Sequence, residues 1–358
     1  MSERRRPVVW DIAEILGELS LILAVICVLY VAWQLWWTGV DSARTQAAQE
    51  DATSWTSPAV QNGSYRIARP QKGKPPVDPK PVTGEIVGQI YIPRFGAEWK
   101  RLIVQGTSLA QLARHGLGHY EETAMPGGVG NFSLAGHRAG YGEPLGNVDK
   151  LRNGDAFVVR THKYWYVYKM TSHEIVLPTQ TDVIAPVPHK FGVTPSQRLI
   201  TMTTCEPRYT TPTHRWIVHG KYVYWAKVSD GIPIELANRT SDGAVDFTQA
   251  KPSWQSLIPP ASTLMAWAII AFVILAISGA VAWGWPGLRR YDDDGYPVHH
   301  TASIFGLIFR LLPGHTAVRT ILMILLISIG VLASFEWLFP WAASSIPVLR
   351  VASNYVTV

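Results

Sequence analysis

The sequence predicts an all-β domain, either a closed barrel or a sandwich, that is attached to three membrane-spanning helices. Seven short runs rich in β-branched and aromatic residues follow one another between Gly- and Pro-containing turns, which is typical of barrels and sandwiches. Three other stretches are apolar over about 20 residues, the length that crosses a bilayer core. Only 16% of the residues are charged and 15 are Trp, which also favours a membrane protein.

The apolar stretches are residues 19–37, 262–285 and 321–341. Several Trp residues lie near their ends, where amphipathic rings favour the membrane interface. Buried helices of a soluble protein are the alternative, but stretches of this length favour membrane spans. A cleaved signal peptide is the alternative for the first stretch, and its apolar length favours an uncleaved anchor.

Basic residues predict the orientation of these spans. Three arginines precede the first span, four lie between the second and third, and one follows the third. Because Lys and Arg are enriched in cytoplasmic loops, we expect residues 1–18 and 286–320 to be cytoplasmic. Residues 41–260 and the tail, 342–358, are then extracellular. The sequence thus predicts a multi-pass plasma-membrane protein.

The extracellular segment divides by composition. Residues 41–84 contain many Pro, Lys, Gly, Ala and Gln residues, which predicts an extended linker or a covering loop. Residues 85–228 hold the β-rich runs, and residues 229–261 are interpreted as a polar tether to the second span. The runs are residues 85–93, 101–106, 131–136, 155–161, 164–176, 198–204 and 215–228.

Two helices are expected beside the spans. Residues 108–115 have Leu109 and Leu112 on one face and Ser108 as a candidate cap. Residues 303–312 have apolar side chains at helical spacing. This second helix either lies along the inner membrane face as an amphipathic helix or extends into the third span.

The net charge of +6 belongs to residues 41–260. A modest and dispersed excess of basic residues suits a domain near an anionic surface or envelope polymer. No basic cluster or aromatic-basic motif accompanies it, so we expect no nucleic-acid partner.

The chain has two cysteines, Cys27 within the first span and Cys205 in the extracellular segment. An intramolecular disulfide is therefore excluded for Cys205, although exported proteins usually pair their cysteines. A lone cysteine of this kind is either a small buried core residue or a nucleophile. Composition alone does not separate the two.

The residues around Cys205 favour chemistry. Arg215 opens the next run, so neighbouring strands would place its guanidinium near the thiol, where it would stabilise an oxyanion. A histidine would complete the site, and His137 ends a run before a Gly-rich loop. His214 and His219 are alternatives by spacing. The alternative is that neither residue is catalytic. Arg215 would then be a solvated residue at the barrel rim, and His137 would be an ordinary surface histidine.

These residues occur in an order that resembles sortases, the membrane-anchored cysteine transpeptidases of Gram-positive envelopes. "LITMTTC", which ends at Cys205, is similar to their T-L-x-T-C signature, with Met202 where Leu is usual, and Arg215 matches the arginine that follows. Residues 126–155 resemble the family's histidine segment, including an L-x-x-G-D turn. The resemblance covers residues 85–228 and implies a closed eight-stranded barrel with His137, Cys205 and Arg215 at one rim.

The resemblance also implies a reaction. Cys205 attacks the Thr–Gly bond of a C-terminal sorting motif, Arg215 stabilises the oxyanion, and His137 transfers protons. The thioacyl enzyme then passes a surface protein to an amine, such as that of lipid II or another peptidoglycan precursor. No cofactor is implied. Neither a zinc motif nor a cluster of acidic residues supports a metal site.

"GHYEETAMPG" resembles a segment of class E sortases, in which the tyrosine is associated with preference for L-A-x-T-G over L-P-x-T-G. Of the residues in this segment, only Tyr120 takes over the expected role in motif preference. The alternative is that Tyr120 is a tyrosine packed at the barrel rim with no role in substrate choice. The resemblance also implies that residues 178–197 line the motif pocket. The candidate substrate-binding residues are Tyr120, Val183, Ile184, Ala185, Thr203 and Thr204.

Two features depart from the family pattern. The second and third spans are additional to the single anchor usual in class E, although pilus-building class C enzymes often add one. Asp78–Pro79 is followed by Lys80 and not by the aromatic residue of a pilus-enzyme lid. The alternatives are a class C-like pilus polymerase, a catalytically silent sortase-like module that binds sorting signals, and an envelope cysteine peptidase of another fold.

Overall fold

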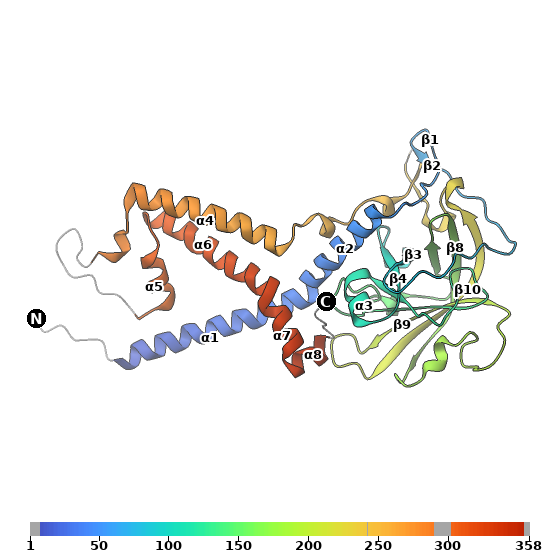
Figure 1. Cartoon of the computed structure of the whole chain (residues 1–358), viewed down its shortest axis with the longest axis horizontal. Coiled ribbons are helices and arrows are strands. Elements are labelled where there is room, and N and C mark those ends of the chain that lie inside the picture. Colours follow the sequence, from blue (N-terminus) through green and yellow to red (C-terminus); the bar gives the residue numbers. More distant parts are fainter. Residues whose placement is uncertain (1–7, 242, 290–301, 354–358) are drawn as a thin grey trace, which may run out of the picture. The chain divides into compact units, whose positions relative to one another are not determined.

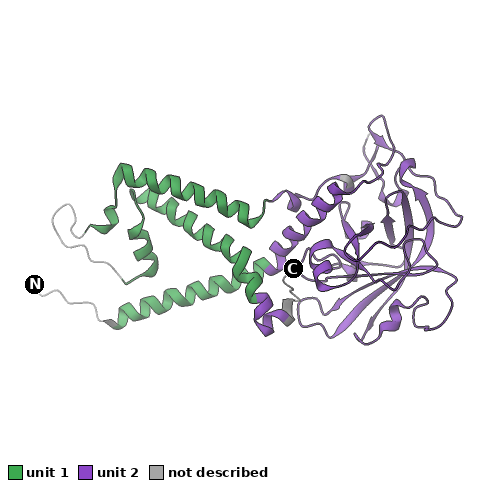
Figure 2. Ribbon diagram, in the orientation of Figure 1, with its two compact units in different colours: residues 1–33, 259–342 green, residues 34–258, 343–358 purple. Residues whose placement is uncertain are grey.

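In the computed structural model, residues 8–241, 243–289 and 302–353 are described. The chain forms two compact units, shown in Figure 2. Residues 1–33 and 259–342 make up a helical unit, and residues 34–258 and 343–358 make up a second unit that contains the strands.

A closed barrel of eight strands forms the second unit's centre (Figure 1). Its order is β10-β8-β7-β3-β4-β5-β6-β9. The pairs β4–β5 and β6–β9 are parallel, and the other pairs are antiparallel. The strands are β3 (Ile86–Tyr91), β4 (Lys100–Gln105), β5 (Leu117–His119), β6 (Gly130–Gly136), β7 (Ala156–Arg160), β8 (Tyr164–Val176), β9 (Arg198–Glu206) and β10 (His214–Lys227).

The barrel confirms the predicted fold class and decides between barrel and sandwich. All seven predicted runs are strands, and β5 is the eighth, which the sequence pattern did not reveal. Helix α3 (Leu109–His115) forms as expected, and the Ser108 hydroxyl caps it by accepting from the Gln111 N–H at 3.4 Å. Apolar side chains such as Phe132, Leu134 and Ile200 fill the interior and are at most 1% exposed.

The prediction for residues 41–84 is wrong at its start, because helix α2 (Thr38–Ala52) includes residues 41–52. This helix packs on the barrel through polar side chains. Gln46 accepts the Leu102 N–H at 3.0 Å, and Glu50 forms an ion pair with Lys100 at 2.8 Å. The following segment contains the hairpin β1 (Val60–Gln61) and β2 (Ser64–Tyr65).

Residues 69–84 lie against the barrel. The Tyr166 hydroxyl donates to the Pro76 carbonyl at 3.0 Å. Lys80 donates to the Glu121 backbone, and Thr83 donates to the Glu121 carboxylate at 2.6 Å. The segment is therefore held on the barrel, and it contacts Glu121, the residue next to Tyr120.

Residues 229–258 are not a free tether. Ile232, Leu236 and Phe247 are at most 2% exposed and join a second apolar cluster with Trp165 of β8. The segment includes a second small sheet, β11 (Asn238–Arg239) with β12 (Val245–Asp246). The average composition of the segment is polar, so the sequence did not indicate that these three side chains are buried.

The helical unit and the chain's C-terminal residues contain the remaining helices. They are α1 (Val8–Ala32), α4 (Ala261–Trp283), α5 (Ile304–Leu311), α6 (Thr316–Ala333), α7 (Phe339–Ser345) and α8 (Pro347–Ser353). Within the residues that the structure describes, three helical stretches are long and apolar enough to cross a membrane: Val9–Ala52, Ala261–Trp283 and Thr316–Ser345. Each contains most or all of a predicted span.

Helix α5 confirms the helical periodicity of residues 303–312. Its N-terminus is capped by Ser303, and Glu18 accepts from the Ile304 N–H at 2.6 Å. The helix ends at Leu311 and α6 begins at Thr316, so it is a separate helix and not an extension of the third span. Residues 290–301 of the expected cytoplasmic loop lie outside the described residues.

The packed interior predicts a large cost for removing one of its rings. We expect Phe132→Ala to lower the free energy of unfolding by about 3–5 kcal/mol, because it leaves a cavity inside a closed barrel. The measurement is chemical unfolding of the detergent-solubilised chain. Val223→Ala, at a position that is 47% exposed, is the control. Equal midpoints for the two variants would contradict this assignment of the core.

Candidate active site

The site begins with the register between β9 and β10. Cys205 lies directly opposite Arg215 in this antiparallel pair. Side chains of directly opposed residues leave the same face of a sheet about 4.5–5.5 Å apart at Cβ. The expectation that Arg215 is a strand neighbour of the thiol is therefore correct. Cys205 is half-buried.

His137 comes from the strand on the other side of β9. β6 runs parallel to β9, with Ala135 beside Thr203. Two positions further on are His137, directly after the end of β6, and Cys205, near the end of β9, so both residues reach the same rim. His137 is 5% exposed, and its Nε2 has no hydrogen-bond partner among the residues that the structure describes.

A ring contact and a helix position the His137 loop. The Tyr141 ring lies 4.6 Å from the His137 ring, centroid to centroid. The Tyr141 N–H donates to the Thr38 hydroxyl of α2 at 2.9 Å. The His137 carbonyl accepts from the Leu145 N–H at 3.0 Å. Contacts on both sides therefore fix the loop, although its Gly residues alone would leave it free.

Burial controls the protonation of the pair. It lowers the pKa of His137 to about 4, because an imidazolium loses hydration there. Burial also raises the pKa of Cys205, and the positive charges of Arg215 and then Arg138 partly offset that effect. The free site near neutral pH therefore holds a thiol and a neutral imidazole.

Arg138 is a site residue that the sequence analysis did not single out. Its side chain is 7% exposed, and its guanidinium donates to the Cys205 carbonyl at 3.4 Å. It also pairs with Glu206 and lies 4.9 Å from the Trp216 ring. The only sequence signal was its place directly after His137. Arg138 ties the histidine loop to the end of the cysteine strand.

The alternative histidines have other partners. His219 contacts the Thr201 hydroxyl at 2.9 Å and the Glu174 carboxylate at 2.9 Å. His214 contacts the Thr213 hydroxyl at 2.9 Å. Of the three candidates, His137 alone combines burial with a ring nitrogen that lacks a hydrogen-bond partner in the described part of the chain.

The expected substrate-binding residues fall into two groups. The Tyr120 hydroxyl hydrogen-bonds the Thr203 hydroxyl at 3.0 Å, so these two lie together on the cysteine side of β9. Thr204 is buried and donates to the Gly136 carbonyl at 2.7 Å. Its hydroxyl therefore fixes the strand before His137.

Residues 183–185 follow β8 in the loop that leads to β9. Val183 is buried against Val176 and Ile217, with Ile184 at the margin of this cluster. The Asn131 side chain donates to the Val183 carbonyl at 3.4 Å and the Ala185 carbonyl at 3.1 Å. Asn131 thus holds the loop on the barrel, a role without a sequence signal.

Comparisons with known proteins agree with this geometry. The Sortase domain family matches residues 90–223. Sortase SrtE2 of Streptomyces coelicolor is 34% identical over 238 residues, which cover 63% of this chain and 88% of that protein. The chain belongs to the sortase family.

Other relatives of this sortase extend the comparison. Sortase SrtE1 of Streptomyces coelicolor is 34% identical over 232 residues, covering 62% of this chain and 60% of that protein. The solved sortase E of Streptomyces avermitilis is 38% identical, with a TM-score of 0.40, and the match covers 43% of this chain and 99% of that one. The resemblance to class E is confirmed by the two curated relatives, SrtE1 and SrtE2.

The protonation of the sortase site predicts how its thiol reacts. In a Cys27→Ser background, iodoacetamide alkylation of Cys205 should accelerate as pH rises, with a midpoint above the ordinary cysteine pKa, because only the thiolate reacts. Arg215→Gln should slow alkylation at pH 7.5, since it removes the charge that most favours the thiolate.

Mass spectrometry of the alkylated chain measures both rates, with N-acetylcysteine as the reference thiol. A rate that levels off below pH 7 would mean that a stable thiolate exists at rest.

Proposed function

We propose that this sortase cleaves a C-terminal sorting motif between Thr and Gly and transfers the released acyl group to an amine of a cell-wall precursor. The observation that supports this most is the register that sets Arg215 opposite Cys205, with the His137 loop on the neighbouring strand. Nucleophile, oxyanion partner and proton carrier then meet at one rim, as acyl transfer requires.

The roles follow from the chemistry of each group. The Cys205 sulfur adds to the Thr carbonyl carbon, and Arg215 stabilises the oxyanion that forms. The C–N bond to Gly breaks as His137 delivers a proton to the leaving amine, which yields a thioester and a shortened peptide. An incoming amine then adds to the thioester, His137 accepts its proton, and the thiolate leaves.

The neutral resting pair has a consequence for this cycle. Attack needs a thiolate, and departure of the amine needs a protonated imidazole. The pKa of Cys205 is raised and that of His137 is lowered, so only a minor fraction of the free enzyme holds the reactive pair at neutral pH. Arg215 and Arg138 favour that fraction because both charges stabilise the thiolate.

Tyr120 and Thr203 are the proposed determinants of motif choice. Their hydroxyls are hydrogen-bonded to each other beside the cysteine strand. Proline has no N–H, whereas alanine at the second motif position offers one to the Tyr120 oxygen. This supports a preference for L-A-x-T-G over L-P-x-T-G, with the carbonyl-bearing segment 183–185 along the pocket.

The three apolar helices support anchoring in a membrane. We place the barrel on the extracellular side of a Gram-positive plasma membrane, with residues 1–18 and 286–320 inside. The partners are then surface proteins that bear a sorting motif and the amine of lipid II or another peptidoglycan precursor. A buried and partnered Arg138 beside Cys205 favours an active enzyme over a catalytically silent binding module.

Removal of the thiol tests the reaction directly. We expect Cys205→Ala to lose all detectable cleavage of an L-A-x-T-G peptide while its thermal unfolding stays near that of the parent, because Ala fills a half-buried position. Mass spectrometry of peptide and amine mixtures with the full chain in detergent gives cleavage and transfer products. Cys27→Ala is the control. Cleavage of the peptide by the Cys205→Ala variant would contradict this mechanism.

Motif choice is tested at Tyr120. One hydrogen bond contributes about 0.5–1.5 kcal/mol, so Tyr120→Phe should reduce the preference for the alanine peptide by about 2- to 13-fold. The measurement is the ratio of kcat/KM for L-A-x-T-G and L-P-x-T-G peptides. Tyr65→Phe, which packs on Phe247, is the control. An unchanged ratio would assign Tyr120 to packing alone.

A further inference from the structure

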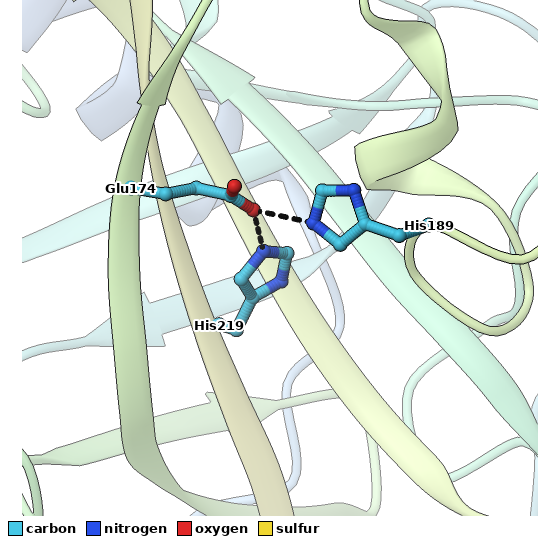
Figure 3. Close-up of side chains that lie close together, drawn as sticks. All are labelled: Glu174, His189 and His219. Atoms are coloured by element: carbon cyan, nitrogen blue, oxygen red, sulfur yellow. Dashed lines mark hydrogen bonds and ion pairs between the residues drawn. The ribbon is translucent and has the colours of Figure 1, made fainter.

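Three side chains gather on the surface of the barrel, and one of them, His219, lies four positions beyond Arg215 on β10. Glu174 lies on β8, His219 lies on β10, and His189 belongs to the loop between β8 and β9. Their ligand atoms all lie within 4.8 Å of one another. Figure 3 shows both imidazole rings directed at one oxygen of the carboxylate.

The contacts are specific to one atom of each ring. The His189 Nε2 is 2.7 Å from Glu174 Oε1, and the His219 Nε2 is 2.9 Å from the same oxygen. Two nitrogens and an oxygen thus converge on one point. The three residues come from sequence positions up to 45 residues apart, so folding alone brings them together.

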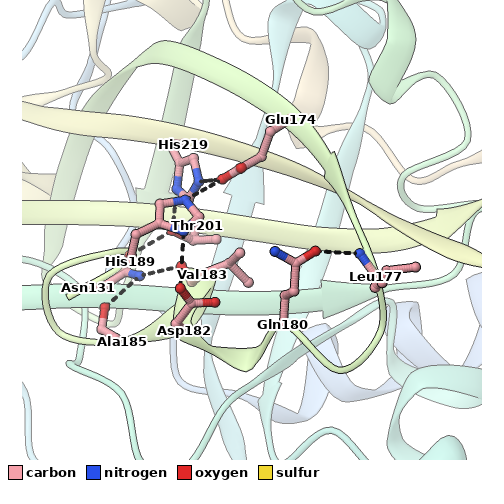
Figure 4. A network of polar contacts seen from close by, with 10 residues as sticks. All are labelled: Asn131, Glu174, Leu177, Gln180, Asp182, Val183, Ala185, His189, Thr201 and His219. Atoms are coloured by element: carbon pink, nitrogen blue, oxygen red, sulfur yellow. Dashed lines mark hydrogen bonds and ion pairs between the residues drawn. The ribbon is translucent and has the colours of Figure 1, made fainter. Parts of the chain in front are cut away.

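The opposite nitrogen of His219 fixes which tautomer is present. Asn131 uses its amide N–H groups on the Val183 and Ala185 carbonyls, so its oxygen is the acceptor for the Thr201 hydroxyl at 2.9 Å. Thr201 has then donated its one proton and must accept from His219 Nδ1, also at 2.9 Å. Figure 4 traces this chain of contacts.

His189 follows the same pattern. Its Nδ1 lies 3.2 Å from the Asp182 carboxylate, which accepts a proton and offers none. In the neutral ring, the Nε2 of each histidine therefore carries a lone pair that faces Glu174 Oε1. Two lone pairs against a carboxylate oxygen repel one another unless a proton or a metal ion lies among them.

We propose that Glu174, His189 and His219 bind a divalent transition metal of the zinc class. Two imidazoles and one carboxylate are a ligand set that zinc accepts, with a water molecule in the fourth position. Both histidines already donate their other ring proton to an oxygen, as metal-binding histidines almost always do. Calcium prefers oxygen ligands and does not suit a site with two nitrogens.

The surroundings admit an ion. The three side chains are 14–44% exposed and line a cavity of about 470 Å³. Ligand atoms about 2.1 Å from a tetrahedral zinc lie roughly 3.4 Å apart, so each histidine nitrogen needs to move about 0.5–0.7 Å further from the Glu174 oxygen. His189 has a φ of 62°, a sparsely populated conformation of the kind that clusters at ligand clamps.

Metal binding at this place would act on the loop between β8 and β9. His189 belongs to that loop, whereas Glu174 and His219 belong to barrel strands. Asn131 and Thr201 link His219 to the Val183 and Ala185 carbonyls of the same loop. An ion shared by all three ligands therefore fastens the loop to the sheet. This inference does not depend on the proposed reaction.

The test uses Zn²⁺ and the full chain in detergent, in a Cys205→Ala background that removes a competing sulfur ligand. The chain is stripped with a chelator, supplied with Zn²⁺ and desalted, and its metal content is measured by mass spectrometry. We expect one Zn²⁺ per chain and slower amide exchange in residues 177–197. Ca²⁺ at the same concentration should produce neither effect.

Variants locate the ion. Glu174→Gln and His219→Gln each remove a ligand and should abolish zinc retention at one equivalent. Asp182→Asn leaves all three ligands in place and should weaken binding by about 10–100-fold. His173→Gln is the matched control, because His173 adjoins Glu174 on β8 and stacks on Trp216 instead.

Two results would overturn the proposal. If the parent chain retains no zinc, then hydrogen bonds alone, and not a metal ion, hold Glu174, His189 and His219 together. If all variants retain it equally, the ion binds elsewhere. Asp182→Asn keeps the test informative if a ligand variant misfolds, since it changes a half-buried side chain to one of the same size and its effect on binding is graded.

Discussion

The pairing of β9 with β10 is the constraint on which the site depends. Side chains alternate between the two faces of a strand, so a shift of one residue in this pairing would turn Arg215 away from Cys205. The register is set by what lies further along the same strands, where Ile200, Met202 and Val218 fill the barrel. Packing of the apolar interior thus determines which charged group faces the thiol at the rim.

Burial of the rim shapes its electrostatics as strongly as the charges do. Two guanidinium groups favour the thiolate of Cys205, yet loss of hydration outweighs them and the pKa is raised. The same loss keeps His137 neutral. The arginines are held by Glu206, Trp216 and backbone contacts, so their charges stay in place.

The strands that are rich in β-branched and aromatic residues were predictable from the sequence, and so was the order His137, Cys205, Arg215. β5 was not, because three residues are too few to show a period. Helix α2 was missed because its surface is polar and it is stabilised by Gln46 and Glu50 contacts with β4. Arg138 and Asn131 act through hydrogen bonds to distant backbone atoms, and only the folded chain brings those atoms within reach.

The hydrogen bond between Thr38 and Tyr141 bears on where the chain can be cut. A soluble fragment that starts at residue 85 keeps every barrel strand and the three rim residues, but it loses the helix that supports the histidine loop. A fragment that starts at residue 34 keeps this support. If the fragment that starts at residue 85 is inactive, the cause would then be the loss of the helix that supports the histidine loop and not the loss of a membrane anchor.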